Sequence, residues 1–208
     1  MEEWVGGIWD RFIRRAAYRG YPQAAVTLES MREIAAPYFR AMGGNAAASV
    51  KSGSMQAHGG PRRWLEKIAG TGTHSEFAWC DGEALYLPEK IDHFDDAELN
   101  RELYLWLTTL AAFTGDEANG WERNLNATRA VLAALPGWRS RYLALVSAHL
   151  ALRPSEQSLS GIAARLEGAV RAQLCEPEKY CLLPTIDAAQ LSRYLWPVAL
   201  WLRLDLPE

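Results

Sequence analysis

The sequence predicts a mainly α-helical domain with one small β-hairpin around residues 74–87. Apolar residues recur at helical spacing over most of the 208 residues, and proline and glycine separate the helical stretches. Only one stretch alternates between apolar and polar residues in the way that a half-buried strand does. The chain is 49% apolar and 23% charged, which is typical of a globular protein with its own hydrophobic core.

The first helical stretch, residues 4–16, is amphipathic and basic. Its large apolar residues recur at helical spacing, and Arg11, Arg14 and Arg15 add positive charge to the stretch. Two interpretations stay open at this point. The arginines form a solvated helix face, or they form a docking surface for an acidic partner.

A second helix is expected to end near Met42, and its start is ambiguous. Pro22 suits a first turn, whereas Thr27 and Ser30 both suit an N-cap. Pro37 should kink or split the helix, because proline removes a hydrogen bond inside a helix.

The pair Gly43-Gly44 should end this helix. Residues 43–60 are rich in Gly, Ala and Ser, so they are expected to form a loop with an extended piece near Val50. Residues 61–68 are expected to form a short helix.

The stretch from His74 to Leu87 predicts the β-hairpin. Residues up to Cys80 alternate, Asp81-Gly82 favours a two-residue type I′ turn, and Leu85 falls on the same side as Leu87 in the second strand.

Helices are expected to dominate the rest of the chain. One begins after Asp95 or Asp96, carries an apolar stripe to Phe113 and stops at Gly115. Further helices are expected at residues 119–135, 138–152, 156–175 and 187–196. Short connections between them imply antiparallel neighbours. The chain is therefore expected to form a single domain over residues 1–208, with a weak boundary near residues 115–120.

Composition excludes several classes of protein. The formal net charge of -3 argues against a nucleic-acid-binding protein, which usually carries a strong excess of basic residues. The longest apolar runs, residues 103–113 and 195–202, are shorter than the ~20 residues of a membrane-spanning helix. Three cysteines do not make a disulfide framework, so a reducing, cytoplasmic location is expected, with Cys80 as the one thiol near the surface.

Catalytic motifs are not found in the sequence. It lacks a P-loop, a Gly-x-Gly-x-x-Gly fingerprint, a Gly-x-Ser-x-Gly elbow and a His-Glu-x-x-His helix. One enzymatic alternative remains, a metal-dependent hydrolase with a degenerate zincin-like layout that uses His93, Asp95 and Glu98 or Glu102. The simpler interpretation treats these acidic residues as helix caps and dipole partners. His149 falls on an apolar helix stripe and is expected to be a core histidine.

Tryptophan is abundant, with nine residues in the chain. Most are expected in the core, and Trp106 lies on the stripe of the helix after the hairpin. Trp201 belongs to a very apolar C-terminal stretch. That stretch either packs back onto the core or meets a partner, for which Trp201 would be an anchor.

Several short blocks of sequence resemble the N-terminal region of the NorD family, the nitric oxide reductase activation proteins. The blocks are Glu2-Glu3-Trp4-Val5-Gly6, Trp9-Asp10-Arg11-Phe12-Ile13, Tyr21-Pro22, Ala24-Ala25-Val26-Thr27-Leu28-Glu29, Phe39-Arg40-Ala41-Met42-Gly43-Gly44, Arg63-Trp64-Leu65, Ile68-Ala69-Gly70, Ala78-Trp79, Leu85-Tyr86-Leu87-Pro88 and Leu99-Asn100-Arg101-Glu102-Leu103-Tyr104-Leu105-Trp106-Leu107. The blocks span about residues 2–113, are specific in combination and contain no catalytic motif.

The resemblance implies a partner that composition cannot supply. NorD proteins pair with a MoxR-type AAA+ ATPase to activate nitric oxide reductase, apparently so that its non-haem iron can be installed. The related CbbO proteins reactivate rubisco with another MoxR ATPase. Both families carry a C-terminal von Willebrand A domain with an Asp-x-Ser-x-Ser metal site, a motif that this chain lacks. The resemblance therefore implies that these residues correspond to the N-terminal region of a longer protein.

The resulting hypothesis is a non-enzymatic adaptor domain that docks on a MoxR-type AAA+ ATPase. The remodelled target is nitric oxide reductase or, in the CbbO-type alternative, rubisco. No catalytic, cofactor-binding or metal-binding residue is predicted. The residues expected to contact a partner are Arg11, Arg14, Arg15 and Trp201.

Overall fold

A computed structural model describes residues 20–53, 77–81, 83–115, 119–179 and 188–204 of the chain. The helices are α2 (Leu28–Ala41), α4 (Ala97–Ala112), α5 (Gly120–Ala134), α6 (Trp138–Leu152), α7 (Gly161–Cys175) and α8 (Ala188–Tyr194), with short 3-10 turns η1 (Pro22–Ala24) and η2 (Glu156–Ser158). The strands are β1 (Val26–Thr27), β2 (Ser49–Ser52), β3 (Trp79–Cys80), β4 (Ala84–Leu87) and β5 (Lys90–Ile91). This arrangement confirms the predicted fold class, mainly α with a small β element. The helices expected at residues 4–16 and 61–68 lie outside the described residues.

Helix α2 begins after the N-cap residue Thr27 and ends before Gly43, two of the residues that the sequence offered as its bounds. Thr27 is the N-cap, and its hydroxyl oxygen accepts a hydrogen bond from the backbone N–H of Ser30. Pro37 lies inside the helix without splitting it. After Met42, Gly43 adopts a φ of 97°, and the N–H of Gly44 donates to the carbonyl of Phe39. A glycine accepts this left-handed backbone without strain, which explains why the helix stops there.

The β-hairpin is present, formed by β3 and β4, and its turn differs from the prediction. Trp79 pairs with Tyr86 and Cys80 with Leu85, so the chain reverses between Asp81 and Ala84, one residue later than a turn centred on Asp81-Gly82. The Asp81 carboxylate accepts hydrogen bonds from the N–H groups of Glu83 and Ala84, which favours this later reversal. Residues 74–76 lie outside the described residues.

Strand β4 is the centre of a three-stranded sheet in the order β2-β4-β3. The extended piece predicted near Val50 is β2, which runs parallel to β4 and pairs Val50 with Leu85. All four residues of β4 are buried, because this central strand is covered on both faces. A second, two-stranded ribbon joins β1 to β5 in antiparallel register.

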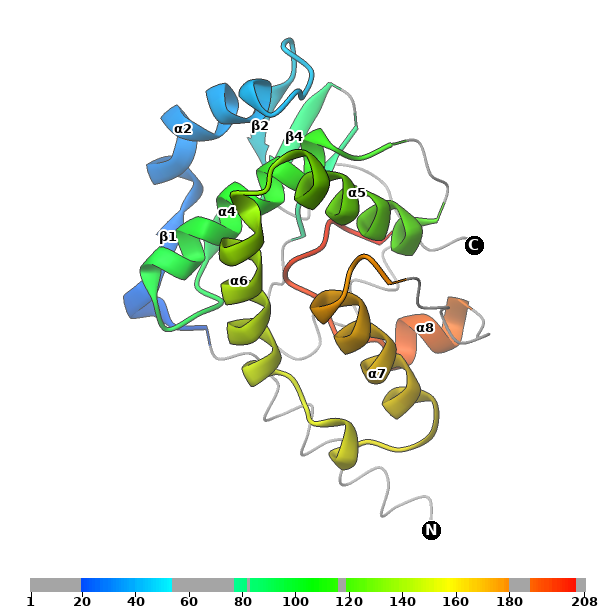
Figure 1. Ribbon diagram of the computed structural model, residues 1–208. Coiled ribbons are helices and arrows are strands. Elements are labelled where there is room, and N and C mark those ends of the chain that lie inside the picture. Colours follow the sequence, from blue (N-terminus) through cyan, green and yellow to red (C-terminus); the bar gives the residue numbers. More distant parts are fainter. Residues whose placement is uncertain (1–19, 54–76, 82, 116–118, 180–187, 205–208) are drawn as a thin grey trace.

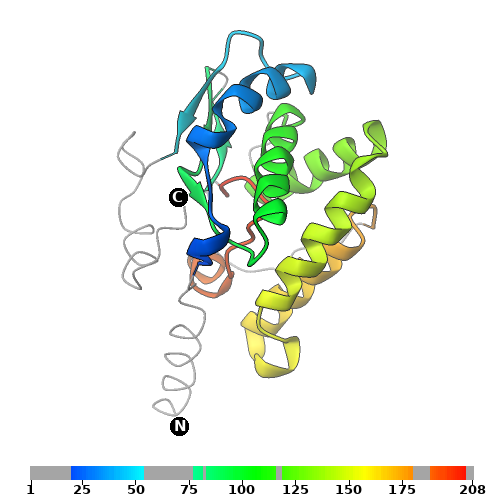
Figure 2. The ribbon, with the colours of Figure 1, turned by 90° about the vertical axis from the view of Figure 1, so that its left-hand side faces the viewer.

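Helix α4 lies at the middle of the molecule. It contacts α2 and β4 on one side and α5 and α6 on the other. Figures 1 and 2 show the result as layers, with the strands and α2 on one side of α4 and α5, α6 and α7 on the other. Helix α6 has the predicted bounds, whereas α7 begins at Gly161 instead of residue 156, because η2 and a Gly161 with φ of 58° interrupt the chain before it. No helix in the described part of the chain is long and apolar enough to cross a membrane.

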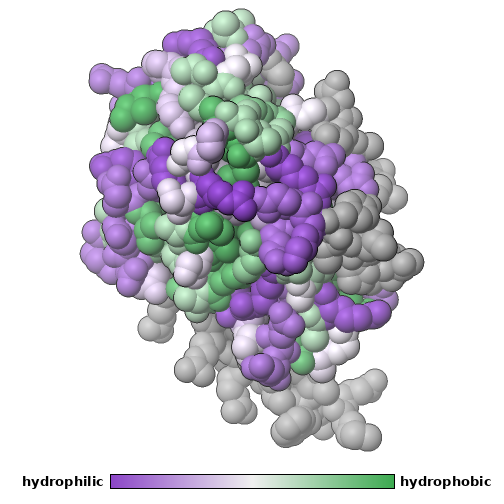
Figure 3. Space-filling model, in the orientation of Figure 1, coloured by the Kyte–Doolittle hydropathy of each residue, from purple (hydrophilic) through white to green (hydrophobic). Residues whose placement is uncertain are grey.

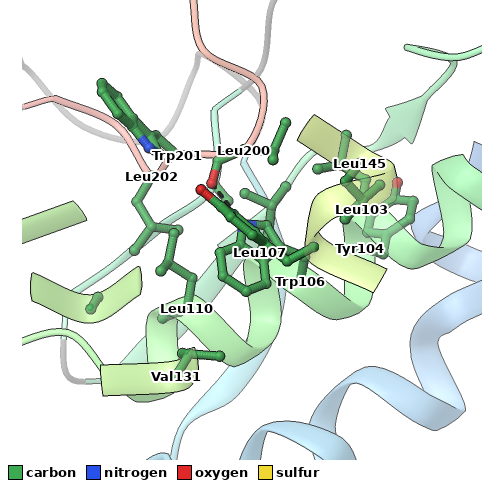
Figure 4. Close-up of a cluster of buried hydrophobic side chains, with 14 of the residues drawn as sticks. Leu103, Tyr104, Trp106, Leu107, Leu110, Val131, Leu145, Leu200, Trp201 and Leu202 are labelled. Carbon is green, nitrogen blue, oxygen red and sulfur yellow. Dashed lines mark hydrogen bonds between the residues drawn. The ribbon is translucent and has the colours of Figure 1, made fainter. Parts of the chain in front are cut away.

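The C-terminal segment, residues 195–204, passes through the core between these layers. Val198, Leu200, Trp201 and Leu202 are buried, although the segment forms no regular helix or strand. The indole N–H of Trp106 donates to the carbonyl of Leu200 at 2.8 Å, and Figure 4 shows the apolar side chains that surround this hydrogen bond. The segment is therefore part of the core and not a loose tail.

Replacing Trp106 tests how much the core depends on α4. Its ring is fully buried and packs against Trp138 and Tyr142. We expect Trp106→Ala to lower the free energy of unfolding by about 3–5 kcal/mol, the usual cost of deleting a buried large ring. Urea unfolding followed by circular dichroism measures the change. Ile34→Ala, at a site that is 47% exposed, is the control and should change stability by less than about 0.5 kcal/mol.

Candidate functional site

The structure locates one of the four residues that were predicted to contact a partner. Trp201 is 3% exposed, and its ring lies 4.8 Å from that of Trp121 in an edge-to-face contact. The C-terminal stretch thus packs back onto the core, the first of its two interpretations. Arg11, Arg14 and Arg15 lie outside the described residues, so the docking role of the basic stretch stays a prediction.

The residues of the hydrolase alternative do not come together. Glu98 pairs with Arg101 at 2.8 Å, and Glu102 forms a hydrogen-bonded ion pair with Arg141. Asp95 is exposed, and Asp96 caps α4 by accepting the N–H of Glu98. Over the described ranges, no group of three His, Cys, Asp or Glu side chains is placed to hold a metal ion. The geometry of these acidic residues therefore supports their role as helix caps and ion-pair partners.

His93 turns instead toward His149 on α6. The Nε2 atom of His93 lies 2.8 Å from the Nδ1 atom of His149, so one imidazole donates and the other accepts. His149 is 2% exposed, which confirms the predicted core histidine. Burial, and then the nearby positive charge of Arg153, lower the pKa of His93 to about 4. Burial, and then the electrostatic effects of Arg153, His93 and Arg171, lower the pKa of His149 well below its ordinary value, so both rings are neutral at pH 7.

A buried ion network lies beside this histidine pair. The guanidinium of Arg153, at the C-terminal end of α6, donates to both carboxylate oxygens of Glu167 at 3.0 and 2.8 Å. Arg171 donates to the same carboxylate at 2.9 Å. The side chains of Arg153 and Glu167 are only 3% and 1% exposed. Two guanidinium groups thus share one buried carboxylate.

Nη1 of Arg153 lies 3.3 Å from Nε2 of His149, which links the network to the histidine pair. The other remaining donors of the two arginines bind backbone carbonyls. Arg153 donates to the carbonyl of Pro197 and Arg171 to the carbonyl of Pro154. Because Pro197 belongs to the C-terminal segment, the network joins α6, α7 and that segment. Sequence reasoning missed it. The available signal was a carboxylate, Glu167, on a side of α7 that is apolar apart from Glu167 and Gln173.

Two buried asparagines hold irregular segments in a similar way. Asn124 on α5 accepts from the N–H of Leu202 at 2.7 Å and donates to the carbonyl of the same residue at 3.1 Å. Asn100 on α4 accepts from the N–H of Phe94 at 2.8 Å and donates to its carbonyl at 2.9 Å. Each side-chain amide thus binds both the N–H and the C=O of one backbone residue, as a neighbouring strand would in a sheet. These interior polar groups position chain segments, and their hydrogen bonds are made within the fold.

The prediction for the cysteines is wrong in one respect. Cys175, the last residue of α7, is exposed, whereas Cys80 is only partly exposed. The helical period turns Cys175 away from the buried stripe that ends at Leu174. Cys80 was therefore not the one thiol near the surface.

The surface offers one feature of a different kind, an exposed helix face without charge. We call it the α6 outer face and define it by residues that are all exposed: Ser140, Leu143, Ala144, Ser147, Ala151 and Leu152. Leu143 and Leu152 are 45% and 43% exposed. Figure 3 shows hydrophobic side chains over α6, bordered by hydrophilic ones.

The histidine pair predicts a loss of stability in mild acid. The pKa of His93 is about 4 in the folded chain and near 6.5 in the unfolded chain, so the unfolded chain binds more protons between these values. The stabilisation is complete above pH 6.5 and falls as pH decreases toward 4, by on the order of 3 kcal/mol for His93. Urea unfolding at a series of pH values measures it. The double variant His93→Gln and His149→Gln should show a smaller dependence, and an unchanged dependence would contradict this assignment.

The ion network predicts an unequal response to the loss of two arginines. Arg153→Leu leaves the buried Glu167 with one cation and should destabilise the fold by about 3–5 kcal/mol. Arg101→Leu removes the exposed pair with Glu98 and should cost less than about 1 kcal/mol. Urea unfolding at pH 7.5 measures the free energy of unfolding of both variants. Equal losses would contradict the claim that Arg153 stabilises the fold through the buried network.

Comparison with known proteins extends the resemblance over nearly the whole chain. An uncharacterized protein of Pseudomonas aeruginosa is 41% identical over 97% of this chain and 32% of its own length. Protein NorD of Stutzerimonas stutzeri is 39% identical over 97% of this chain and 32% of its own length. Protein NorD of Brucella abortus is 30% identical over 74% of this chain and 26% of its own length.

The chain spans about a third of the length of the first two relatives. No protein-family model matches it, and no solved structure does. The likeness is wider than the blocks between residues 2 and 113, because the helices beyond them are matched as well. The comparisons confirm the resemblance to the NorD family, since this chain is homologous over nearly its whole length to one region of Protein NorD.

Proposed function

We propose that this chain is a non-catalytic adaptor domain that docks on a MoxR-type AAA+ ATPase and helps to activate nitric oxide reductase by insertion of its iron. The observation that carries the proposal is the match to Protein NorD over 97% of the chain. The resemblance supplies the ATPase and the reductase as partners. The proposed place of action is the cytoplasm, where the ATPase finds ATP.

The interior of the fold is compatible with such a role. Arg153, Asn100 and Asn124 use their hydrogen bonds to hold segments of the chain together. An adaptor for an ATP-driven ring needs a stable body that couples two binding sites, while the ring supplies the energy. A chaperone-like function in denitrification would thus depend on the surface of this domain.

The choice between the two targets rests on the relatives. Those that carry a functional name are called Protein NorD, which favours the reductase over rubisco. Neighbouring genes test this choice. Reductase genes beside the gene for this chain support the proposal, and rubisco genes would transfer it to the CbbO-type alternative.

The basic stretch supplies the proposed docking surface. Arg11, Arg14 and Arg15 lie within five residues of one another, and a basic helix attracts an acidic surface on a partner. Trp201 is not part of this surface, because its ring is buried against Trp121.

Co-purification with a MoxR-type ATPase from the same genome tests the proposal. With ATP present, light scattering should detect a stable complex of the ring and this chain. The triple variant Arg11→Glu, Arg14→Glu and Arg15→Glu should weaken that complex at least tenfold and leave the circular dichroism spectrum unchanged.

A second triple variant, with the same change in net charge but at other exposed arginines, is the matched control. Arg32, Arg40 and Arg165 are exposed on α2 and α7, and their reversal to glutamate should leave the affinity within about twofold. A folded chain that forms no complex would refute the adaptor role of this region. Equal losses for both triple variants would refute the assignment of the surface.

A further inference from the structure

The α6 outer face is unusual for an exposed surface of a helix. From Leu143 to Leu152 the sequence contains no Asp, Glu, Lys or Arg, and its one titratable residue, His149, points inward and is buried. A helix at the surface of a globular protein normally carries charged or polar residues on its solvent side. From Leu143 onward the exposed residues of α6 are leucine, alanine and serine, whereas Arg139, which is exposed one turn earlier, pairs with Glu178.

Helix α2 provides an internal comparison. Its solvent side also carries a large exposed apolar residue, Ile34, which is 47% exposed. Charged residues surround Ile34, however, with Glu33 next to it and Arg32 paired to Glu29 at 3.1 Å. A single leucine or isoleucine among charges needs no explanation, whereas a continuous uncharged face does.

Within the described residues, the core does not account for the α6 outer face. The opposite side of the helix is already filled, because Tyr142, Leu145 and His149 are each at most 2% exposed. Arg153 fixes the C-terminal end of the helix to α7, and Arg141 fixes its first turns to α4 through Glu102. The helix is therefore held in a rotation that directs Leu143 and Ala144 away from the core.

The relatives contain a further part that is available to cover this face. The match takes in 97% of this chain and 32% of Protein NorD from Stutzerimonas stutzeri, so about two thirds of that protein lies outside it. We propose that the α6 outer face binds the part of a NorD-type protein that lies outside the matched region. When two parts belong to one polypeptide, their effective concentration is high, and a small apolar contact is sufficient to keep them together.

The shape of the face specifies the chemistry of its occupant. The middle of the face is a strip of small residues, Ala144, Ser147 and Ala151. The larger side chains of Leu143 and Leu152 lie on opposite sides of this strip. Small side chains allow another backbone to approach closely, so the occupant presents an uncharged surface, such as a helix with alternating large and small apolar residues. This inference rests on the match to Protein NorD and is independent of docking on the ATPase.

Binding in trans is the first test. The 208-residue chain is titrated by calorimetry with the two thirds of the Stutzerimonas stutzeri protein that lie outside the match. The two should bind, and Leu143→Glu should weaken binding at least tenfold, because it places a charge in an apolar contact. Ile34→Glu is the matched control, since Ile34 is 47% and Leu143 45% exposed, and it should leave the affinity within twofold.

A second measurement keeps the inference testable where the separated part does not fold. Residues 1–208 replace the matched third of Protein NorD, and a cysteine is introduced as Ala144→Cys or, for comparison, as Ile34→Cys. Alkylation at each position is followed by mass spectrometry. In the joined protein the thiol at position 144 should react at least tenfold more slowly than in the 208-residue chain alone, and the thiol at position 34 should react equally in both.

Three results would overturn the inference. The first is equal alkylation at position 144 in the two proteins. The second is a dimer of the 208-residue chain that Leu143→Glu dissociates, which would assign the face to a second copy. The third is loss of ATPase binding by Leu143→Glu, which would assign the face to the ring. Loss of ATPase binding through the Arg11, Arg14 and Arg15 variant alone would leave the inference intact.

Discussion

The hydrogen bond from the indole of Trp106 to the carbonyl of Leu200 joins the centre of α4 to the C-terminal segment. That segment runs through the core without the backbone hydrogen bonds of a helix or a sheet, so its buried N–H and C=O groups need other partners. Trp106, Asn124 and Arg153 supply them from three different helices. The packing of α4 against α5 and α6 therefore depends on a segment that lies close to the C-terminus.

Polar groups in this core determine position more than they add stability. Burying Arg153 and Glu167 removes two charges from water, and such a pair often gains little over apolar residues of the same size. The pair does, however, restrict where the end of α6, the middle of α7 and Pro197 can lie, because the planar guanidinium of Arg153 donates to acceptors on α7 and on the C-terminal segment at once. One buried donor, the Nε1 atom of Trp121, has no partner in the described part of the chain. The packing of its ring against Trp201 evidently outweighs that loss.

The sequence predicted helix bounds best where proline and glycine next to the helix determine them. Helix α6 could be predicted residue by residue, because Pro136-Gly137 precedes it and Pro154 follows it. The start of α7 was placed five residues too early, because Ser155 and Ser160 both suit an N-cap and α7 begins after Ser160. Glu167 could be noticed in the sequence, but the network around it could not be predicted, because it joins Glu167 through Arg153 to His149 and His93 across elements far apart in the chain. The charge-free stretch of α6 was visible in the sequence, and only the structure showed that half of it faces solvent.

The two proposed surfaces, residues 11–15 and the α6 outer face, differ in chemistry and would make different kinds of contact. An uncharged face of leucine, alanine and serine gains its affinity by excluding water, which suits a lasting contact within one polypeptide. Positive charges such as those of residues 11–15 attract an acidic partner over a longer distance, and the attraction weakens with salt, which would suit the proposed contact with an ATPase that acts in cycles. Raising the ionic strength should therefore separate the two, because it weakens docking through Arg11, Arg14 and Arg15 and leaves the contact at the α6 outer face in place.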